Sequence, residues 1–350
     1  MDNKIRIAVA GAGAIGRVHI SVVRLSSTCR LSAIVDPSPT AVALAKEVGV
    51  PLYATLADLF ANDRPDGVVL ASPNNLHVPQ AIECMAADLP MLLEKPIAPT
   101  VVEAETLVRL AVERGAKILI GHHRAHSPIM AKAREIVCSG RLGRLVAVTG
   151  SAMFMKPDQY FQDAPWRREL GAGPILLNLI HDVHNLRMLC GEIESVQAFA
   201  SHAVRGFPVE DTVAIALRFA CGALGTFLLS DTAASPRSWE QTSRENPAYP
   251  TYEDEDCYVV VGTNGSLSIP TMRLKTYPNA EDRSWWQPFV VGVDDVVRHD
   301  PIRLQMEHFV KVVRGEVAPQ VSARDGLNNL RVTEAISKSA NSGHIVYLDM

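Results

Sequence analysis

The sequence predicts an α/β protein of two domains: a doubly wound parallel sheet, then an α+β domain with a mostly antiparallel sheet. Two patterns support this fold class. Up to about residue 121, short apolar runs alternate with helical patterns; beyond it, strand-like runs follow one another directly. A chain of 350 residues also has room for two cores. We expect domains at 1–122 and 123–322, with 323–350 forming a C-terminal helix and tail that packs back on the first domain.

The first domain is expected to hold six short, continuously apolar strands, which is typical of a parallel sheet covered on both faces. The expected strands are Ile5–Ala10, Leu31–Val35, Pro51–Tyr53, Val68–Ala71, Met91–Leu93 and Ile118–Ile120. Helical patterns lie between them, beginning near Ala14 and at 41–48, 77–87 and 101–114. Thr55 followed by Asp58 predicts a further helix start.

The second domain is expected to place helices at 128–138 and 175–189 around a series of strands. The expected strands are Leu145–Met153, Val196–Ala203, Thr212–Phe219, Leu224–Ser230, Tyr258–Val261 and Ser266–Ile269. Two polar, proline-containing stretches, 232–256 and 278–300, are long enough to suggest functional loops. Helices at 302–314 and 323–340 close the chain.

Composition argues against nucleic acid and membranes as partners of this protein. The net charge is −4, and no basic stripe with interleaved aromatics predicts a nucleic-acid surface. The six cysteines are scattered without a CxxC pair, which favours reduced thiols in a cytosolic protein. No apolar run approaches the roughly 18 residues that span a bilayer. The apolar run near the start is short and broken by glycines, as in a core strand and not a signal peptide. We therefore expect a cytoplasmic protein with a small-molecule substrate and no membrane or nucleic-acid partner.

A glycine-rich turn follows the first strand and predicts a dinucleotide site. In Gly11-Ala-Gly13-Ala14-Ile15-Gly16, the first glycine permits the turn, the second a close approach of pyrophosphate, and the third helix–strand packing. The helix that begins near Ala14 directs its free N–H groups at the phosphates. This combination is characteristic of a Rossmann domain.

Asp36 ends the second expected strand, 20 residues after Gly16. An acid at this position accepts hydrogen bonds from the adenosine ribose and repels a 2′-phosphate. No arginine follows directly, so we expect NAD as the cofactor and not NADP. The alternative is that Asp36 only caps the next helix.

Two further motifs follow the fourth and fifth strands: Ser72-Pro-Asn74-Asn-Leu-His77 and Glu94-Lys95-Pro96. Ligands of doubly wound sheets bind beyond the carboxyl ends of the strands, where both motifs lie. Lys95 is therefore a candidate to face the nicotinamide. The alternative is a surface lysine that pairs with Glu94.

The helix expected near 175–189 carries polar side chains on one face. Asn178, His181 and either His184 or Asn185 lie about one turn apart. An imidazole beside an amide is suited to proton transfer near neutral pH. No HExxH motif or carboxylate set accompanies the histidines, so no metal site is expected.

These residues together resemble the glucose–fructose oxidoreductase/inositol dehydrogenase family (Gfo/Idh/MocA). The resemblance covers nearly the whole chain and includes the glycine turn, the 72–77 and 94–96 motifs, Gly121-His-His-Arg124, Trp166-Arg167 and the helix after Gly171. It implies an N-terminal Rossmann domain and a C-terminal domain with a large open sheet, through which such proteins form dimers or tetramers. It also implies NAD(P)-dependent oxidation of a secondary alcohol on a sugar, cyclic polyol or related ring.

By the same resemblance, Lys95 binds the reacting hydroxyl and His181 serves as acid/base. Leu177 and His184 stand where acids are common in the family, and Asn178 lies beside the first of these positions. Ala125 replaces a frequent polar residue. Ser72, Asn74, His77, Glu94, Trp166 and Arg167 are expected near the cofactor. Arg124, Asn178, His181 and His184 are expected near the substrate, where Asn178 orients the imidazole or holds a hydroxyl.

The substrate stays open at this point. Arg124, Arg167 and Arg237 leave room for an anionic group such as a carboxylate. A cyclic diol dehydrogenase, or a ketone or imine reductase that acts on a carboxylated ring, is therefore an alternative. A protein that senses NAD(H) without turnover is a second alternative, although it would not need both Lys95 and His181.

Overall fold

The computed structural model describes residues 4–349, which divide into two compact units. The first contains 4–126 and 301–330, and the second contains 127–300 and 331–349. The units are therefore not contiguous in sequence: the segment 301–330 returns to the first unit, whereas the sequence predicted 123–322 as one domain. Within the described chain, no helix is both long enough and apolar enough to cross a membrane.

The first unit is built on a six-stranded, wholly parallel sheet in the order β3-β2-β1-β4-β5-β6. Its strands are β1 (Ile5–Ala10), β2 (Cys29–Val35), β3 (Leu52–Tyr53), β4 (Gly67–Leu70), β5 (Met91–Leu93) and β6 (Ile118–Ile120). The order reverses between β1 and β4, so the switch point predicted for ligand binding lies beyond these two strands. The expected doubly wound fold is confirmed.

Local sequence signals mark the ends of several helices of the first unit. They are α1 (Ala14–Leu25), α2 (Pro39–Val48), α3 (Leu56–Asn62), α4 (His77–Ala86) and α5 (Val101–Arg114). Thr55 and Thr100 cap α3 and α5 by accepting from backbone N–H groups three residues on. Gly49 and Gly115 end α2 and α5 in the left-handed conformation.

Helix α10 (Pro301–Arg314) explains why a late segment belongs to the first unit. It contacts α1 and the 3₁₀ turn η2 (His123–His126) of that unit. Its buried face includes Met306, Phe309 and Val310. The sequence shows that this helix is amphipathic, but periodicity alone does not indicate which surface its apolar face will cover.

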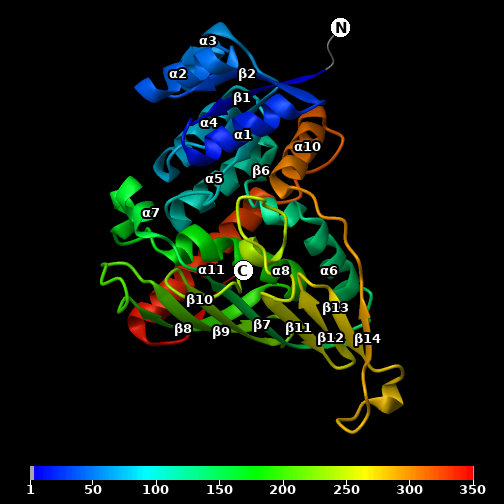
Figure 1. The fold of residues 1–350 in the computed structure, drawn as a ribbon. Helices are drawn as coiled ribbons and strands as arrows, with labels where there is room; N and C mark the ends of the chain where they lie inside the picture. The colour runs from blue at the N-terminus through cyan, green and yellow to red at the C-terminus, as the bar shows by residue number, and fades with distance from the viewer. Residues whose placement is uncertain (1–3, 350) are drawn as a thin grey trace. The chain divides into compact units, whose positions relative to one another are not determined.

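The second unit contains a nine-stranded sheet in the order β14-β13-β12-β11-β7-β10-β9-β8-β15 (Figure 1). Its strands are β7 (Leu145–Met153), β8 (Ile193–Ser201), β9 (Thr212–Phe219), β10 (Leu224–Ser230), β11 (Tyr258–Gly262), β12 (Gly265–Ile269), β13 (Arg273–Thr276), β14 (Val290–Val293) and β15 (Val346–Tyr347). Only the β7–β10 pair is parallel. The predicted mostly antiparallel sheet is confirmed.

Helices cover one face of this sheet. They are α6 (Pro128–Cys138), α8 (Ile180–Cys190) and the C-terminal half of α11 (Ala323–Ser342), and they share one apolar core with the inward side chains of the strands (Figure 1). Trp239 and Tyr258 are fully buried there and stack with ring centroids 5.9 Å apart. Strands β9 and β10 alternate between buried and exposed residues, as a sheet covered on one face requires.

The second unit also holds elements that the sequence did not predict. They are the strand β13, the edge strands β14 and β15, and the short helices α7 (Asp158–Asp163) and α9 (Trp239–Thr242). The helix expected at 175–189 is present, but it begins as a π-helix, η4 (Ile175–Leu179), before α8. This irregular first turn carries Asn178.

Candidate active site

The glycine turn between β1 and α1 has the backbone that a dinucleotide requires. Gly11 lies in the left-handed region at φ +96°, and a Cβ atom there would collide with the Ala71 carbonyl. A Cβ on Gly16 would collide with the Gly11 carbonyl oxygen, so helix and turn pack as closely as the sequence predicted. Space is open around Gly13. The turn therefore leaves an uncovered cradle at the carboxyl end of β1.

Helix α1 supplies the anion-binding end of this cradle. Its first intrahelical hydrogen bond is donated by Arg17 N–H to the Gly13 carbonyl at 3.0 Å. The N–H groups of Ala14, Ile15 and Gly16 precede it and lie at the positive end of the helix dipole. These predicted cofactor residues fit a pyrophosphate.

Asp36 follows β2 and is held beside the glycine turn. Its carboxylate accepts hydrogen bonds from Ala12 N–H at 2.7 Å and Ser38 N–H at 2.8 Å. Burial raises its pKa, but the hydrogen bonds to Ser38 and Ala12 outweigh burial, so the pKa lies below its ordinary value. Asp36 does not cap the helix through its side chain, since the N-cap of α2 is Ser38. An ionised carboxylate at this position suits a ribose and disfavours a 2′-phosphate.

His77 ties two of the predicted motifs together from inside the first unit. It is 1% exposed, and its ring nitrogens lie 2.7 Å from the Pro96 carbonyl and 3.0 Å from the Ser72 carbonyl. Burial lowers its pKa, although the two carbonyls oppose this effect. Ser72 and Asn74 are partly exposed on the turn after β4. The structure therefore places His77 as a support for the Lys95-Pro96 turn.

Lys95 follows β5 and is partly exposed, while Glu94 beside it is buried. The Glu94 carboxylate lies 2.7 Å from His19 Nε2 of α1 and accepts from Lys95 N–H at 3.2 Å. Glu94 is thus buried and not solvated, and it holds the turn through the Lys95 backbone. Arg124, in η2 of the same unit, is 6% exposed.

The second unit brings Asn178 and His181 onto one face, about one turn apart at the η4–α8 junction. His181 and His184 are buried at 6% and 5% exposure, and Asn178 is partly exposed. Below them, Tyr258 donates a short hydrogen bond to Asp182, and Asn185 donates to the same phenol oxygen at 3.2 Å. The helix that carries His181 is therefore anchored in the core by polar contacts.

Trp166 and Arg167 lie in the 3₁₀ turn η3 (Pro165–Arg168) of the second unit. Trp166 is 55% exposed, whereas Arg167 stacks on Tyr160 with its guanidinium carbon 3.8 Å from the ring centroid. Arg167 also donates to the Tyr160 carbonyl at 2.7 Å. Arg237 donates to the Asp256 carbonyl at 3.2 Å.

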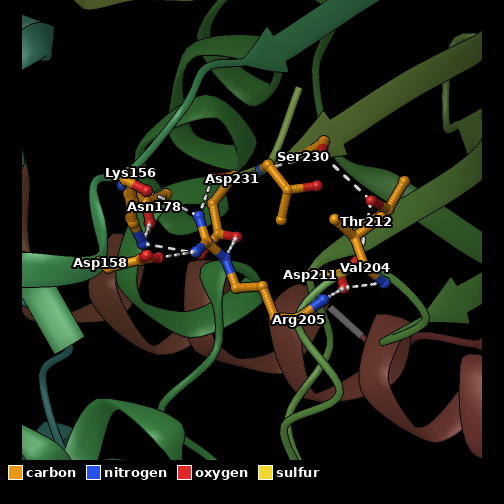
Figure 2. A network of polar contacts seen from close by, with 10 residues as sticks. Lys156, Asp158, Asn178, Val204, Arg205, Asp211, Thr212, Ser230 and Asp231 are labelled. Carbon is orange, nitrogen blue, oxygen red and sulfur yellow. Dashed lines mark hydrogen bonds and ion pairs between the residues drawn. The ribbon is translucent and has the colours of Figure 1, made fainter. Parts of the chain in front are cut away.

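Several polar residues that the sequence analysis did not select surround Asn178 (Figure 2). Lys156 Nζ lies 2.8 Å from Asn178 Oδ1 and 3.3 Å from Asp231 Oδ2, and Arg205 Nε lies 3.0 Å from Asp231 Oδ1. The partly buried Glu210 accepts from Ile175 N–H at 3.0 Å, at the start of the π-helix, and burial raises its pKa. No rule of sequence spacing links these positions to Asn178. The only usable signal was the location of Lys156 just after β7. Among residues 4–349, no group of His, Cys, Asp or Glu is arranged to hold a metal ion.

The fold, the glycine cradle and Asp36 define the class of protein: an oxidoreductase with a dinucleotide-binding domain. The model of the oxidoreductase family with an NAD-binding Rossmann fold matches residues 5–122, and the model of the GFO/IDH/MocA C-terminal domain matches 130–268. The chain belongs to the Gfo/Idh/MocA family, as the sequence predicted, and NAD is its cofactor.

Relatives and solved structures agree over nearly the full length. The rhizopine catabolism protein MocA of Rhizobium meliloti is 25% identical over 96% of this chain and 95% of its own. The inositol 2-dehydrogenase of Rubrobacter xylanophilus is 26% identical over 98% of this chain and 92% of its own. The WlbA dehydrogenase of Bordetella pertussis, solved with NADH and UDP-GlcNAcA, superposes with a TM-score of 0.79 at 24% identity and covers 99% of both chains.

Proposed function

We propose that this protein transfers a hydride between NAD and a secondary alcohol or ketone on a sugar, cyclic polyol or related ring. The observation that carries this proposal is made on each unit by itself: the first presents the glycine cradle and the Lys95 turn, and the second presents the Asn178–His181 face. The names of full-length relatives, among them inositol 2-dehydrogenases and a 1,5-anhydro-D-fructose reductase, support a ring alcohol or ketone as substrate.

The roles follow from the chemistry of each group. NAD supplies the hydride acceptor when bound. His181 takes the hydroxyl proton as the carbinol C–H bond breaks, and Lys95 donates a hydrogen bond that stabilises the developing alkoxide. In the reverse direction, His181 returns the proton to the carbonyl oxygen. Glu94 and His77 fix the backbone around Lys95 and do not touch the substrate.

The test is NADH formation with a panel of inositols, aldoses, uronates and cyclic diols, in parallel with direct binding of NADH. Turnover on a ring alcohol supports the proposal. Tight NADH binding with no turnover on any member would overturn it and favour a sensor of NAD(H). Use of NADH with ring ketones or imines alone would assign the protein to reduction.

We also infer a cytoplasmic homodimer or homotetramer that assembles through the uncovered face of the second unit's sheet. The cross-strand row Phe199–Ala214–Leu228 is exposed, with Phe199 at 71% and Leu228 at 40%. A second copy of the same face would remove this apolar row from water. Light scattering coupled to gel filtration tests this; a monomer at micromolar concentration would contradict it, and Phe199→Glu should dissociate the oligomer.

A further inference from the structure

Lys156 is held rigidly in the second unit between β7 and α7. Its backbone N–H donates to the Asp231 carbonyl at 2.9 Å, and its own carbonyl accepts from Arg205 Nη2 at 2.8 Å. Its side chain is 11% exposed, and its ammonium reaches Asn178 and Asp231 (Figure 2). Hydrogen bonds of the backbone and contacts of the ammonium therefore both hold Lys156 in place.

This ammonium determines which way the Asn178 amide faces. A lysine ammonium has three donors and no acceptor, so the atom that faces it at 2.8 Å must be the amide oxygen. The Nδ2 group then faces away from Lys156. Within residues 4–349 it donates no hydrogen bond, and Asn178 is partly exposed. The position one helical turn before His181 therefore presents an N–H donor and no acceptor.

The charges around Asn178 favour an anion. Lys156 and Arg205 both lie against the carboxylate of Asp231, which is 3% exposed and lies 3.3 Å and 3.0 Å from the two cations. The buried Asp211 carboxylate accepts instead from the backbone N–H groups of Val204 and Arg205. Asp158 lies 3.7 Å from Arg205 but is 91% exposed, so water screens it. Of the side chains Lys156, Arg205 and Asp231, the first two are cations. Glu210 also acts on Lys156, and burial raises the pKa of this carboxyl. Arg167, stacked on Tyr160, adds a further cation next to Lys156.

We propose that Asn178 and Lys156 form a subsite for a carboxylate on the substrate ring, one helical turn before His181. The Nδ2 group donates to a carboxylate oxygen. The Lys156 ammonium fixes the orientation of the amide and attracts the negative charge of the carboxylate. Given the hydride transfer proposed above, on which this inference rests, the substrate class is a carboxylated ring alcohol, such as a uronate. An aspartate at 178 would present a charged acceptor there and would repel a carboxylate.

The experiment is calorimetric binding of glucuronate and galacturonate, against glucose and galactose, to the NADH-loaded protein. The uronates should bind at least about tenfold tighter, since charge-assisted hydrogen bonds discriminate by this order or more. Asn178→Asp and Lys156→Met should each weaken uronate binding at least about tenfold while changing hexose binding less than threefold. Lys156→Arg keeps the cation and should retain most of the preference. Lys132→Met, at an exposed helical Lys–Glu pair, is the matched control.

The outcomes separate this inference from the proposed function. Uronates that bind no better than hexoses, or an unchanged preference in Asn178→Asp, would overturn the subsite even if NADH forms on neutral polyols. Preferential uronate binding without NADH formation on any panel member would leave the subsite standing and overturn the hydride transfer. Circular dichroism shows whether each variant folds. If Lys156→Met does not fold, the nearly isosteric Asn178→Asp alone tests the subsite.

Discussion

Glu94 Oε1 lies 2.7 Å from His19 Nε2 in the interior of the first unit. His19 is 0% exposed and belongs to α1, the helix whose N-terminus forms the cofactor cradle. Glu94 also accepts from the Lys95 backbone at 3.2 Å. One buried contact therefore joins the helix that receives the dinucleotide to the turn that carries the proposed alkoxide-binding lysine.

Removing His19 should weaken both the fold and the turn. His19→Ala leaves the Glu94 carboxylate buried without its partner, which costs about 3 kcal/mol in the free energy of unfolding. His19→Gln keeps an amide donor and should recover part of this loss. Urea unfolding measures the change, and His299→Ala, at an exposed histidine, is the control. A loss below about 0.5 kcal/mol in His19→Ala would contradict the account.

The same pair predicts an acid dependence. Burial raises the pKa of Glu94, but the hydrogen bond from His19 and the nearby cations outweigh it, so the pKa is lowered from about 4.5. A depressed carboxyl pKa stabilises the fold fully above the unfolded value and loses that contribution as pH falls below 4.5. The stability difference between wild type and Glu94→Gln should therefore shrink between pH 6 and pH 3 in urea unfolding. A difference that grows in that range would be inconsistent with an ionised Glu94.

Asp36 should control cofactor choice. Asp36→Ser removes the charge that repels a 2′-phosphate and weakens the contacts to Ala12 and Ser38. The ratio of kcat/KM for NAD over NADP should fall at least about tenfold, as expected for one close charge. Steady-state kinetics with both cofactors measure it, and Glu47→Ala on the exposed face of α2 is the control. An unchanged ratio would remove Asp36 from cofactor selection.

Lys156 should make uronate binding pH-dependent. Burial lowers the pKa of Lys156 to about 8; the Asp231 carboxylate opposes this, while Arg205 and Arg167 add to it. Tyr160 and Glu210 are the other ionisable groups close to it. The cation is present below pH 8 and is lost above it, so uronate affinity should fall as pH rises from 7 to 9. Lys156→Arg, whose guanidinium stays charged, should flatten this profile. If uronate affinity falls equally between pH 7 and 9 in Lys156→Arg, a group other than Lys156 titrates.

The sequence predicted most of the regular structure because continuous apolar runs and cap residues determine it locally. β1, β5, β6, α5 and α6 begin and end at the predicted residues. The edge strand β14 and its neighbour β13 were missed because Arg273–Thr276 is mostly polar and Val290–Val293 is exposed on every residue. An edge strand needs no buried face, so it leaves a weak pattern.

Only those residues of the candidate site that lie at predictable positions of the fold could be selected from the sequence. The glycine turn, Asp36 and Lys95 lie at strand ends, where fold rules relate sequence position to location. Lys156, Arg205 and Asp231 come from separate loops and strand ends, and only the folded chain brings them to Asn178. The π-turn at 175–179 also has no sequence signature comparable to a helix cap.

Transfer of label from substrate to cofactor tests the central claim most directly. A panel alcohol that carries deuterium on its carbinol carbon is incubated with NAD, and the reduced dinucleotide is analysed by mass spectrometry. We expect one deuterium in the dinucleotide. Lys95→Ala should slow its formation about 10²–10³-fold while NADH still binds, and Lys46→Ala, at an exposed helical lysine, should not. Reduced dinucleotide without deuterium, or Lys95→Ala with wild-type turnover, would contradict direct hydride transfer assisted by Lys95.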